Sequence, residues 1–66
     1  MLRNLKAEIL KNNLDIEVMA RALGVKKDTF QRKLNEDISL SLQDCRTIKE
    51  TFFPDLSLDY LFRASG

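Results

Sequence analysis

The chain has 66 residues, of which 44% are hydrophobic and 32% charged, and its formal net charge is +1. A chain of this length forms one domain and buries only about 60% of its unfolded surface, which leaves no room for a deep active site beside the core. No apolar run approaches the ~20 residues that span a bilayer. The composition is that of an ordinary globular protein, so we expect one soluble domain over residues 1–66 without a membrane partner.

The residue types that are scarce exclude several classes of function. There is no histidine, which removes the usual general base and the commonest metal ligand. Two glycines, Gly24 and Gly66, are too few for a glycine-rich phosphate loop. We therefore expect neither an enzyme nor a metal, a cofactor or a small-molecule substrate. The single cysteine, Cys45, has no internal disulfide partner, which favours a reducing, cytoplasmic setting.

Charge is divided unevenly between the two halves. Residues 1–33 hold eight basic and four acidic side chains, a net charge of +4, whereas residues 34–66 hold three basic and six acidic ones, a net charge of −3. A basic half joined to an acidic half suggests an oriented surface with one face suited to a polyanion. Chance scatter of charge over a solvated surface explains the same split equally well.

The first of five predicted helices covers about residues 3–12. Its apolar face is expected to consist of Leu5, Ile9 and Leu10, with Leu2 one turn before. We expect the helix to end at Asn12-Asn13, because asparagine tolerates the left-handed conformation that often follows a helix.

Two further short helices are predicted over about residues 16–23 and 27–34. Asp15 precedes the first of these and is expected to cap it through its side chain. Gly24 is expected to end it, since glycine takes a positive φ at no steric cost.

The pair has the pattern of a helix-turn-helix motif, in which two short helices are joined by a tight turn containing glycine. Each apolar choice has a packing reason. Ala20 is small where the two helices are expected to cross, and the wedge between them is filled by Leu23, Val25 and Phe30. Phe30 and Leu34 lie four residues apart, so they share the buried face of the predicted helix over residues 27–34.

The last two predicted helices follow a connection over residues 35–40. Ser41 and Asp44 have the spacing of a capping box, Pro54 is expected to stop the fourth helix, and Ser57 caps a final turn or two. Cys45 on this apolar face is interpreted as a core filler and not as a reactive thiol. The buried positions predicted for these helices are Leu42, Cys45, Ile48 and Phe52 in the fourth, and Leu58, Leu61 and Phe62 in the fifth.

The run from Ala20 to Val25, with the pattern Ala-x-x-Leu-Gly-Val, resembles the centre of the phage repressor and Cro-like (lambda-repressor-like, XRE-like) family of regulators. Residues 29–35, with the sequence TFQRKLN, are similar to a phage variant of the family's recognition helix. Residues 56–62, with the sequence LSLDYLF, are similar to the family's last helix. The resemblance covers nearly the whole chain. It implies an all-α, compact bundle of four to five short helices with a helix-turn-helix, forming a single DNA-binding domain whose partner is double-stranded DNA. The third helix would then lie in the major groove.

The family resemblance assigns DNA contacts, by position, to Lys26, Lys27, Asp28, Gln31 and Arg32. The residue chemistry agrees with this assignment. With Phe30 and Leu34 turned inward, the 100° helical step puts Asp28, Arg32 and Asn35 on the opposite side. Gln31 can pair bidentately with adenine, and Arg32 with guanine or a phosphate. Asp28 precedes Arg32 by four residues and can hold its guanidinium in place or accept from cytosine.

Lys26 and Lys27 break a local rule at the start of the third helix. Cations at a helix N-terminus oppose the helix dipole by about 0.3–1 kcal/mol each, and a serine or aspartate would suit position 26 better. A phosphate nearby would reverse the sign of that penalty. Two tolerated surface lysines are the simpler interpretation of the same pair.

Two positions depart from the family pattern. Ile16 stands where many members carry a phosphate-contacting glutamine. Asn35-Glu36-Asp37 replaces a turn of the Asn-Gly-Lys type and brings two acids to a place where an amide or a cation would approach DNA. Either binding per monomer is weak, or the acidic turn faces away from DNA.

The leading hypothesis is a sequence-specific DNA-binding transcriptional regulator of phage or prophage origin, such as a repressor, acting on the nucleoid in the cytoplasm of a bacterial or infected host cell. The alternative is a protein-interaction module on the same fold, an antirepressor or a small regulatory adaptor. The acidic second half and the low net charge favour this alternative. The basic third helix, with its glutamine and arginine, favours DNA.

A homodimer formed through the C-terminal region is also predicted. Four of the five aromatic residues lie in the last fifteen positions: Phe52, Phe53, Tyr60 and Phe62. So small a domain is not expected to bury them all together with the neighbouring leucines, so some apolar surface should stay exposed. Two-fold pairing would bury that surface and place two recognition helices about one DNA turn apart, ~34 Å. Alternatively, these aromatic residues complete the core of a monomer.

Overall fold

Five short helices make up the regular structure, as predicted. The computed structural model describes residues 2–35 and 38–63, and no strand occurs among them. The helices are α1 (Arg3–Lys11), α2 (Ile16–Leu23), α3 (Lys27–Leu34), α4 (Leu42–Phe52) and α5 (Leu58–Leu61). They form a compact globule with principal extents of 25 × 23 × 21 Å. In these residues no helix combines the length and the apolar character needed to cross a membrane.

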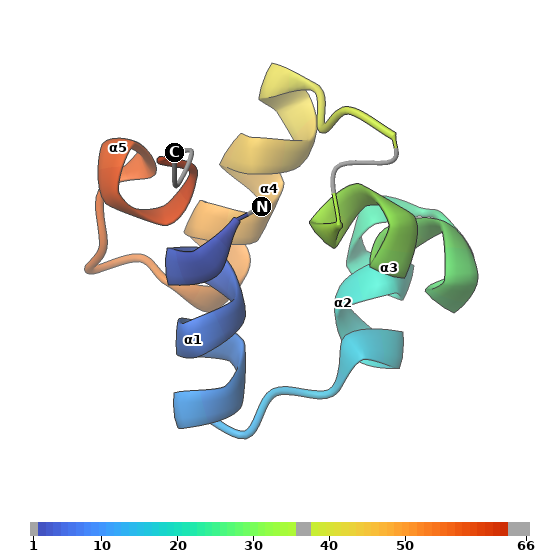
Figure 1. The fold of residues 1–66 in the computed structure, drawn as a ribbon, viewed down its shortest axis with the longest axis horizontal. Coiled ribbons are helices and arrows are strands. Elements are labelled where there is room, and N and C mark those ends of the chain that lie inside the picture. Colours follow the sequence, from blue (N-terminus) through green and yellow to red (C-terminus); the bar gives the residue numbers. More distant parts are fainter. Residues whose placement is uncertain (1, 36–37, 64–66) are drawn as a thin grey trace.

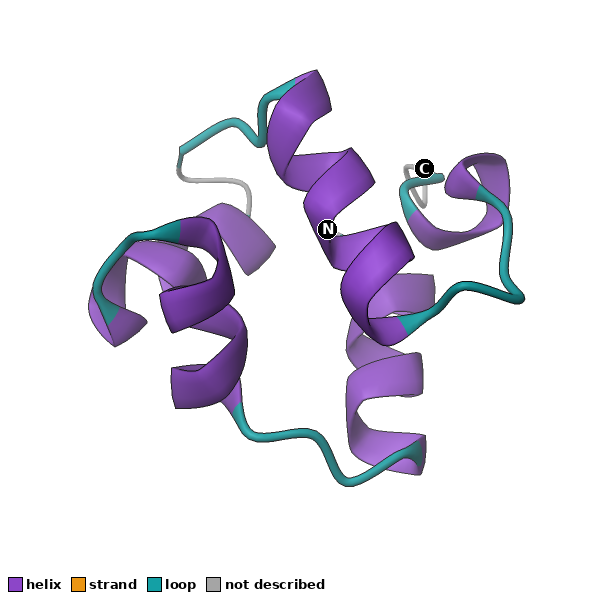
Figure 2. Ribbon diagram, turned by 180° about the vertical axis from the view of Figure 1, so that it is seen from behind, coloured by secondary structure: helices purple, strands orange, loops and turns teal. Residues whose placement is uncertain are grey.

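Helix α4 lies in the middle of the molecule (Figure 1). On one side it packs against α2, which in turn packs against α3, and on the other side it packs against α5. Helix α1 completes the bundle by contacting α5. The view from behind shows the same order, with the α2–α3 pair and α5 on opposite sides of α4 (Figure 2). As a result, α3 and α5 lie at opposite ends of the long axis.

The predicted N-terminal caps are confirmed at three helices. The Asp15 carboxylate accepts a hydrogen bond from the Glu17 amide at 2.8 Å at the start of α2. The Ser41 hydroxyl accepts from the Asp44 amide at 3.0 Å, and the Asp44 carboxylate accepts from the Ser41 amide at 3.3 Å, which completes the capping box of α4. Ser57 caps α5 through the amide of Tyr60. Each bond satisfies a backbone amide that the helix itself leaves without a partner.

Helices α1 and α2 end with the same hydrogen-bonding pattern. Asn13 has φ of 53° and Gly24 has φ of 71°, so both residues are left-handed. The Leu14 amide donates to the Ile9 carbonyl and the Val25 amide to the Ala20 carbonyl, each at 3.0 Å. This is the Schellman arrangement, in which a left-handed residue turns the chain and the next amide reaches back five residues. It confirms the helix ends predicted at the asparagine pair and at Gly24.

The core receives one fully buried side chain from every helix: Leu5, Met19, Phe30, Ile48 and Leu61. Ala20 is also buried, while Leu23 and Val25 are half-buried against the same cluster, as the predicted packing between α2 and α3 requires. Burying an aliphatic or aromatic side chain contributes about 1.5–3 kcal/mol. Because each helix supplies such a side chain, no helix is held by local interactions alone.

Two predicted core positions are wrong. Leu10 is 80% exposed, because Ile9, next to it on the helix, takes the inward position together with Leu2 and Leu5. Leu42 is 67% exposed, since it is the first residue of α4 and that turn extends past the neighbouring helices (Figure 1). The buried side of α4 begins one turn later.

The C-terminal aromatic residues pack against the core, three of them with part of their surface exposed. Phe53 is buried, and Phe52, Tyr60 and Phe62 are half-buried and packed against the core. The large apolar side chains that are exposed in the described ranges lie elsewhere: Leu10, Val18, Ile38 and Leu42. The expected apolar exposure at the C-terminal end is therefore limited to half-buried side chains, and the aromatic residues contribute to the core of the monomer.

Polar contacts between α1 and α5 hold Tyr60 in place. The Tyr60 hydroxyl donates to the carboxylate of Glu8, a largely buried residue, at 2.9 Å. The Asn4 side-chain amide donates to the Tyr60 carbonyl at 2.8 Å. The hydrogen bond to Glu8, partial burial and the charge of Glu8 together raise the pKa of Tyr60. The partners are more than fifty residues apart in sequence, so no local pattern predicts this junction.

Candidate nucleic-acid interface

The outward face of α3 and its two flanking residues carry the six residues singled out from the sequence. All of them are exposed: Lys26, Lys27, Asp28, Gln31, Arg32 and Asn35. The opposite face of the helix is anchored, because Phe30 and Leu34 are buried in the core. The polar face is therefore held in a fixed orientation toward solvent.

Asp28 and Arg32 form the ion pair expected from their spacing. The Arg32 Nε lies 3.5 Å from Asp28 Oδ2, and the two side chains are 61% and 78% exposed. Such an exposed pair contributes only about 0.3–0.5 kcal/mol to stability. The pair uses the Nε end of the guanidinium, and Arg32 has four further N–H donors on its terminal nitrogens.

Asn35 has a partner that the sequence did not indicate. Its side-chain oxygen accepts a hydrogen bond from Lys6 Nζ at 2.6 Å, which connects the C-terminal end of α3 to α1. The two residues are 29 positions apart, so the contact depends on how the helices pack. Asn35 is exposed, as predicted, and it is the residue that follows the last turn of α3. The acids that follow it, Glu36 and Asp37, lie outside the described residues.

The start of α3 has no side-chain cap. Lys26 has the extended backbone of an N-cap residue, with φ of −75° and ψ of 155°, but its side chain accepts no hydrogen bond. Lys27 is the first residue of the helix and adds a second cation at the positive end of the dipole. By contrast, Asp15, Ser41 and Ser57 cap α2, α4 and α5. Helix α3 thus begins, like α1, without a side-chain cap. Its start carries two lysines against one acid in the first turn, Asp28, and this net positive charge is suited to an anion.

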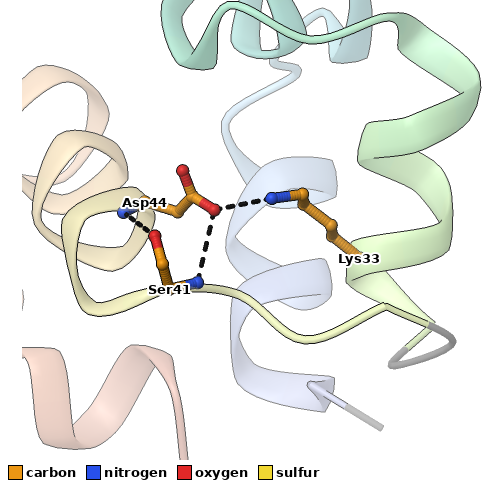
Figure 3. A network of polar contacts seen from close by, with 3 residues as sticks. All are labelled: Lys33, Ser41 and Asp44. Carbon is orange, nitrogen blue, oxygen red and sulfur yellow. Dashed lines mark hydrogen bonds and ion pairs between the residues drawn. The ribbon is translucent and has the colours of Figure 1, made fainter.

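Lys33 connects α3 to α4 and is not part of the exposed face. Its Nζ lies 2.7 Å from Asp44 Oδ2, and the two side chains are only 14% and 16% exposed (Figure 3). The same oxygen accepts from the Ser41 amide, so the capping box and the ion pair share one carboxylate. Burial by itself raises the pKa of Asp44. Hydrogen bonds from Lys33 and Ser41, together with the positive charge of Lys33, outweigh that effect and lower the pKa of the carboxyl. This contact fixes α3 against the centre of the molecule.

Cys45 follows Asp44 on α4 and is half-buried. Burial and the neighbouring Asp44 charge raise the pKa of the thiol. A raised pKa keeps the group in its unreactive thiol form, which supports its interpretation as a core filler. No group of three or more carboxylate, thiol or imidazole side chains in residues 2–35 and 38–63 is arranged to hold a metal ion.

The charge split in the sequence corresponds to a separation in space. Lys26, Lys27 and Arg32 are exposed at the end of the molecule formed by α3. At the opposite end, α5 and the segment before it expose Asp55 and Asp59 (Figure 1). A polyanion would therefore approach the α3 end preferentially.

Comparison with known proteins found no relative: no protein family, no curated protein sequence and no solved structure matches this chain. The candidate interface is consequently argued from its own geometry and residue chemistry.

We expect Asp44→Asn to destabilise the protein by about 1–2 kcal/mol at pH 7, because it removes the charge that Lys33 neutralises. The pKa of Asp44 is lower in the folded state, so its contribution is complete above the unfolded-state pKa of about 3.9 and is lost as the pH falls through the folded-state value. Urea unfolding at pH 7 and near pH 2 measures this. Asp59→Asn, which removes the exposed partner of Arg63, is the control and should cost under about 0.5 kcal/mol. An equal loss for Asp44→Asn at both pH values would contradict the assignment.

We expect Lys26→Ser to stabilise the fold by about 0.5–1 kcal/mol, since it adds a capping hydroxyl and removes a cation from the positive dipole end. Lys27→Ser is the matched control, because it removes the same charge at a position that cannot cap the helix. Thermal unfolding of both variants separates capping from charge. Equal stability of the two variants would show that position 26 does not act as an N-cap.

Proposed function

We propose that this chain is a sequence-specific DNA-binding transcriptional regulator in which α2 and α3 form a helix-turn-helix and α3 is the recognition helix. The observation that carries the proposal is the exposed face of α3. On this face Arg32, paired with Asp28, follows Gln31 in the last turn of a helix whose start is uncapped and carries two lysines. The proposal rests on this face and on the resemblance to the phage repressor and Cro-like family.

The packing of α2 and α3 supports a helix-turn-helix. The helices are joined by residues 24–26, and the left-handed Gly24 provides the change of direction. Ala20 is buried, and Phe30 is fully buried between the helices and the core. A small residue, a glycine turn and an aromatic wedge are what a close crossing of two short helices requires.

The chemistry of the exposed side chains suits double-stranded DNA. Arg32 can donate two parallel hydrogen bonds to guanine, and the Gln31 amide can donate to and accept from adenine. Lys26 and Lys27 would neutralise phosphates at the positive end of α3, where a backbone phosphate also meets free amides. A phage or prophage origin and a repressor role follow from the family resemblance alone.

Pairing of two copies through the C-terminal region belongs to the same proposal. The surface available for it is a hollow of about 250 Å³ whose lining includes Leu2, Ile38, Leu40, Cys45 and Phe62. Phe62 contributes from the C-terminal end, and Ile38 is 40% exposed. Because the aromatic residues themselves pack inward, this interface would be smaller than their number suggests.

The same surface favours the second candidate, a protein-interaction module such as an antirepressor or a regulatory adaptor. Exposed Ile38 lines the hollow, Leu42 is a second exposed apolar side chain, and a net charge of +1 is low for a DNA-binding protein. Binding to random duplex DNA separates the candidates, since phosphate contacts make affinity fall steeply with salt concentration.

We expect Arg32→Ala and Gln31→Ala each to weaken binding to a selected DNA site by about 1–3 kcal/mol and to relax one base preference. Stability should barely change, because both side chains are exposed. Arg63→Ala is the matched control: Arg63 also forms an exposed pair with an aspartate four residues away, but at the other end of the molecule. Titration of duplexes selected from a random library measures the effect. An equal loss of affinity for Arg63→Ala would contradict the assignment of α3 as the recognition helix.

We expect the protein to bind a pseudo-palindromic site as a dimer, with two α3 helices ~34 Å apart. Sedimentation of the protein alone and with one or two half-sites measures the stoichiometry. Ile38→Glu, which places a charge beside the hollow, should reduce pairing, whereas Val18→Glu, at an exposed apolar position on α2, should leave it unchanged. A single monomer on each half-site at every concentration would rule out the dimer.

A further inference from the structure

A hollow lies beside the candidate interface, where α1 approaches α2 and α3. It has a volume of about 380 Å³, and its lining includes Lys6, Ile16, Gln31, Leu34 and Asn35. Two of these residues, Gln31 and Asn35, belong to the proposed DNA-binding face. Lys6 comes from α1, a helix to which the sequence assigned no contact with DNA.

The side chain of Lys6 is divided between apolar and polar surroundings. It also lines an adjoining apolar hollow together with Ile9, Leu14 and Ile16, and the residue is half-buried. Its ammonium group reaches the Asn35 side-chain oxygen at 2.6 Å. A lysine with an apolar stem along a groove and its charge at the rim holds that charge in a defined place.

Within residues 2–35 and 38–63, the partner of Lys6 is a neutral amide, and a bond to an amide does not neutralise the positive charge. The contrast is Lys33, whose charge is neutralised by the Asp44 carboxylate at 2.7 Å. An ammonium group has three N–H donors, and the bond to Asn35 uses one of them. In the described ranges this ammonium group has no ion pair and no second hydrogen bond, so two donors and the charge face the edge of the α3 face there.

We propose that Lys6 is a phosphate-binding residue of the DNA interface, with Asn35 as the positioning residue that holds its ammonium group. This inference rests on the proposed function. The sugar-phosphate backbone beside the bases contacted by Gln31 would then be held from α1 and α3 together. Two helices on one backbone segment fix the register of α3 in the groove.

A phosphate contact has a different signature from a base contact. It supplies affinity that does not depend on sequence, and it contributes about 0.9 to the slope of log affinity against log salt concentration. Loss of Lys6 should therefore weaken binding to a selected duplex and to a random duplex by the same factor, and should make the slope shallower by about one. Loss of Gln31 should instead act on the selected duplex alone.

The experiment compares Lys6→Gln, which removes the charge, with Lys6→Arg, which keeps it. Lys11→Gln is the control, because it removes an exposed lysine from a different side of the same helix. Affinities for both duplexes are measured over a range of salt concentrations, and unfolding is measured in parallel. If Lys6→Gln proves poorly folded, Lys6→Met is used in place of that variant, because methionine retains an unbranched apolar side chain. We expect the shallower slope for Lys6→Gln or Lys6→Met only, with Lys6→Arg and Lys11→Gln close to the parent.

The outcomes separate this inference from the proposed function. If the parent binds DNA and Arg32→Ala loses the selected site, but Lys6→Gln keeps the parental slope, the role of Lys6 is overturned and the function stands. A loss for Lys6→Gln that is confined to the selected duplex would also overturn it, since a phosphate contact carries no sequence preference. If the parent binds neither duplex at any salt concentration, the proposed function itself fails.

Discussion

The burial of Phe30 is the contact on which the arrangement of this molecule depends. Phe30 is the largest fully buried side chain and comes from an eight-residue helix that would not be stable alone. Its burial, with that of Leu34, determines which side of α3 faces solvent. The orientation of Gln31 and Arg32 is therefore a consequence of core packing and not of any contact that these exposed residues make.

The lysines around α3 have different roles because their partners differ. Lys33 is paired with a carboxylate and shielded from solvent, so its charge stabilises the contact between α3 and α4. Lys6 is held by the neutral amide of Asn35, which is its one hydrogen-bond partner in the part of the chain that the structure describes. Lys26 occupies a capping position that a serine would fill better, and a bound phosphate would turn that local cost into affinity. Residues that reduce local stability are common at the functional sites of proteins.

The opposite end of the molecule is organised by polar contacts within the core region. The hydrogen bond from Tyr60 to Glu8 and the bond from Asn4 to the Tyr60 carbonyl join α1 to a four-residue α5. So short a helix has little intrinsic stability, and these contacts together with Leu61 hold it in place. This anchoring holds Tyr60 against α1, while Phe53 is buried and Phe52 and Phe62 pack against the core.

The sequence by itself determined the helix boundaries and the exposed face of α3. Caps and ends such as Asp15, Gly24 and the Ser41–Asp44 box act over two to five residues, and the spacing of Phe30 and Leu34 defines a buried face within one helix. Only the tertiary structure decided which leucines lie in the core, since Leu10 and Leu42 fit a local apolar pattern but are exposed. Ile9 takes the inward position in place of Leu10, and the first turn of α4 carries Leu42 past the neighbouring helices (Figure 1). The tertiary structure also decided the partners of Lys6, Lys33 and Tyr60. These contacts join residues 11 to 52 positions apart, and their formation depends on how the helices pack against one another.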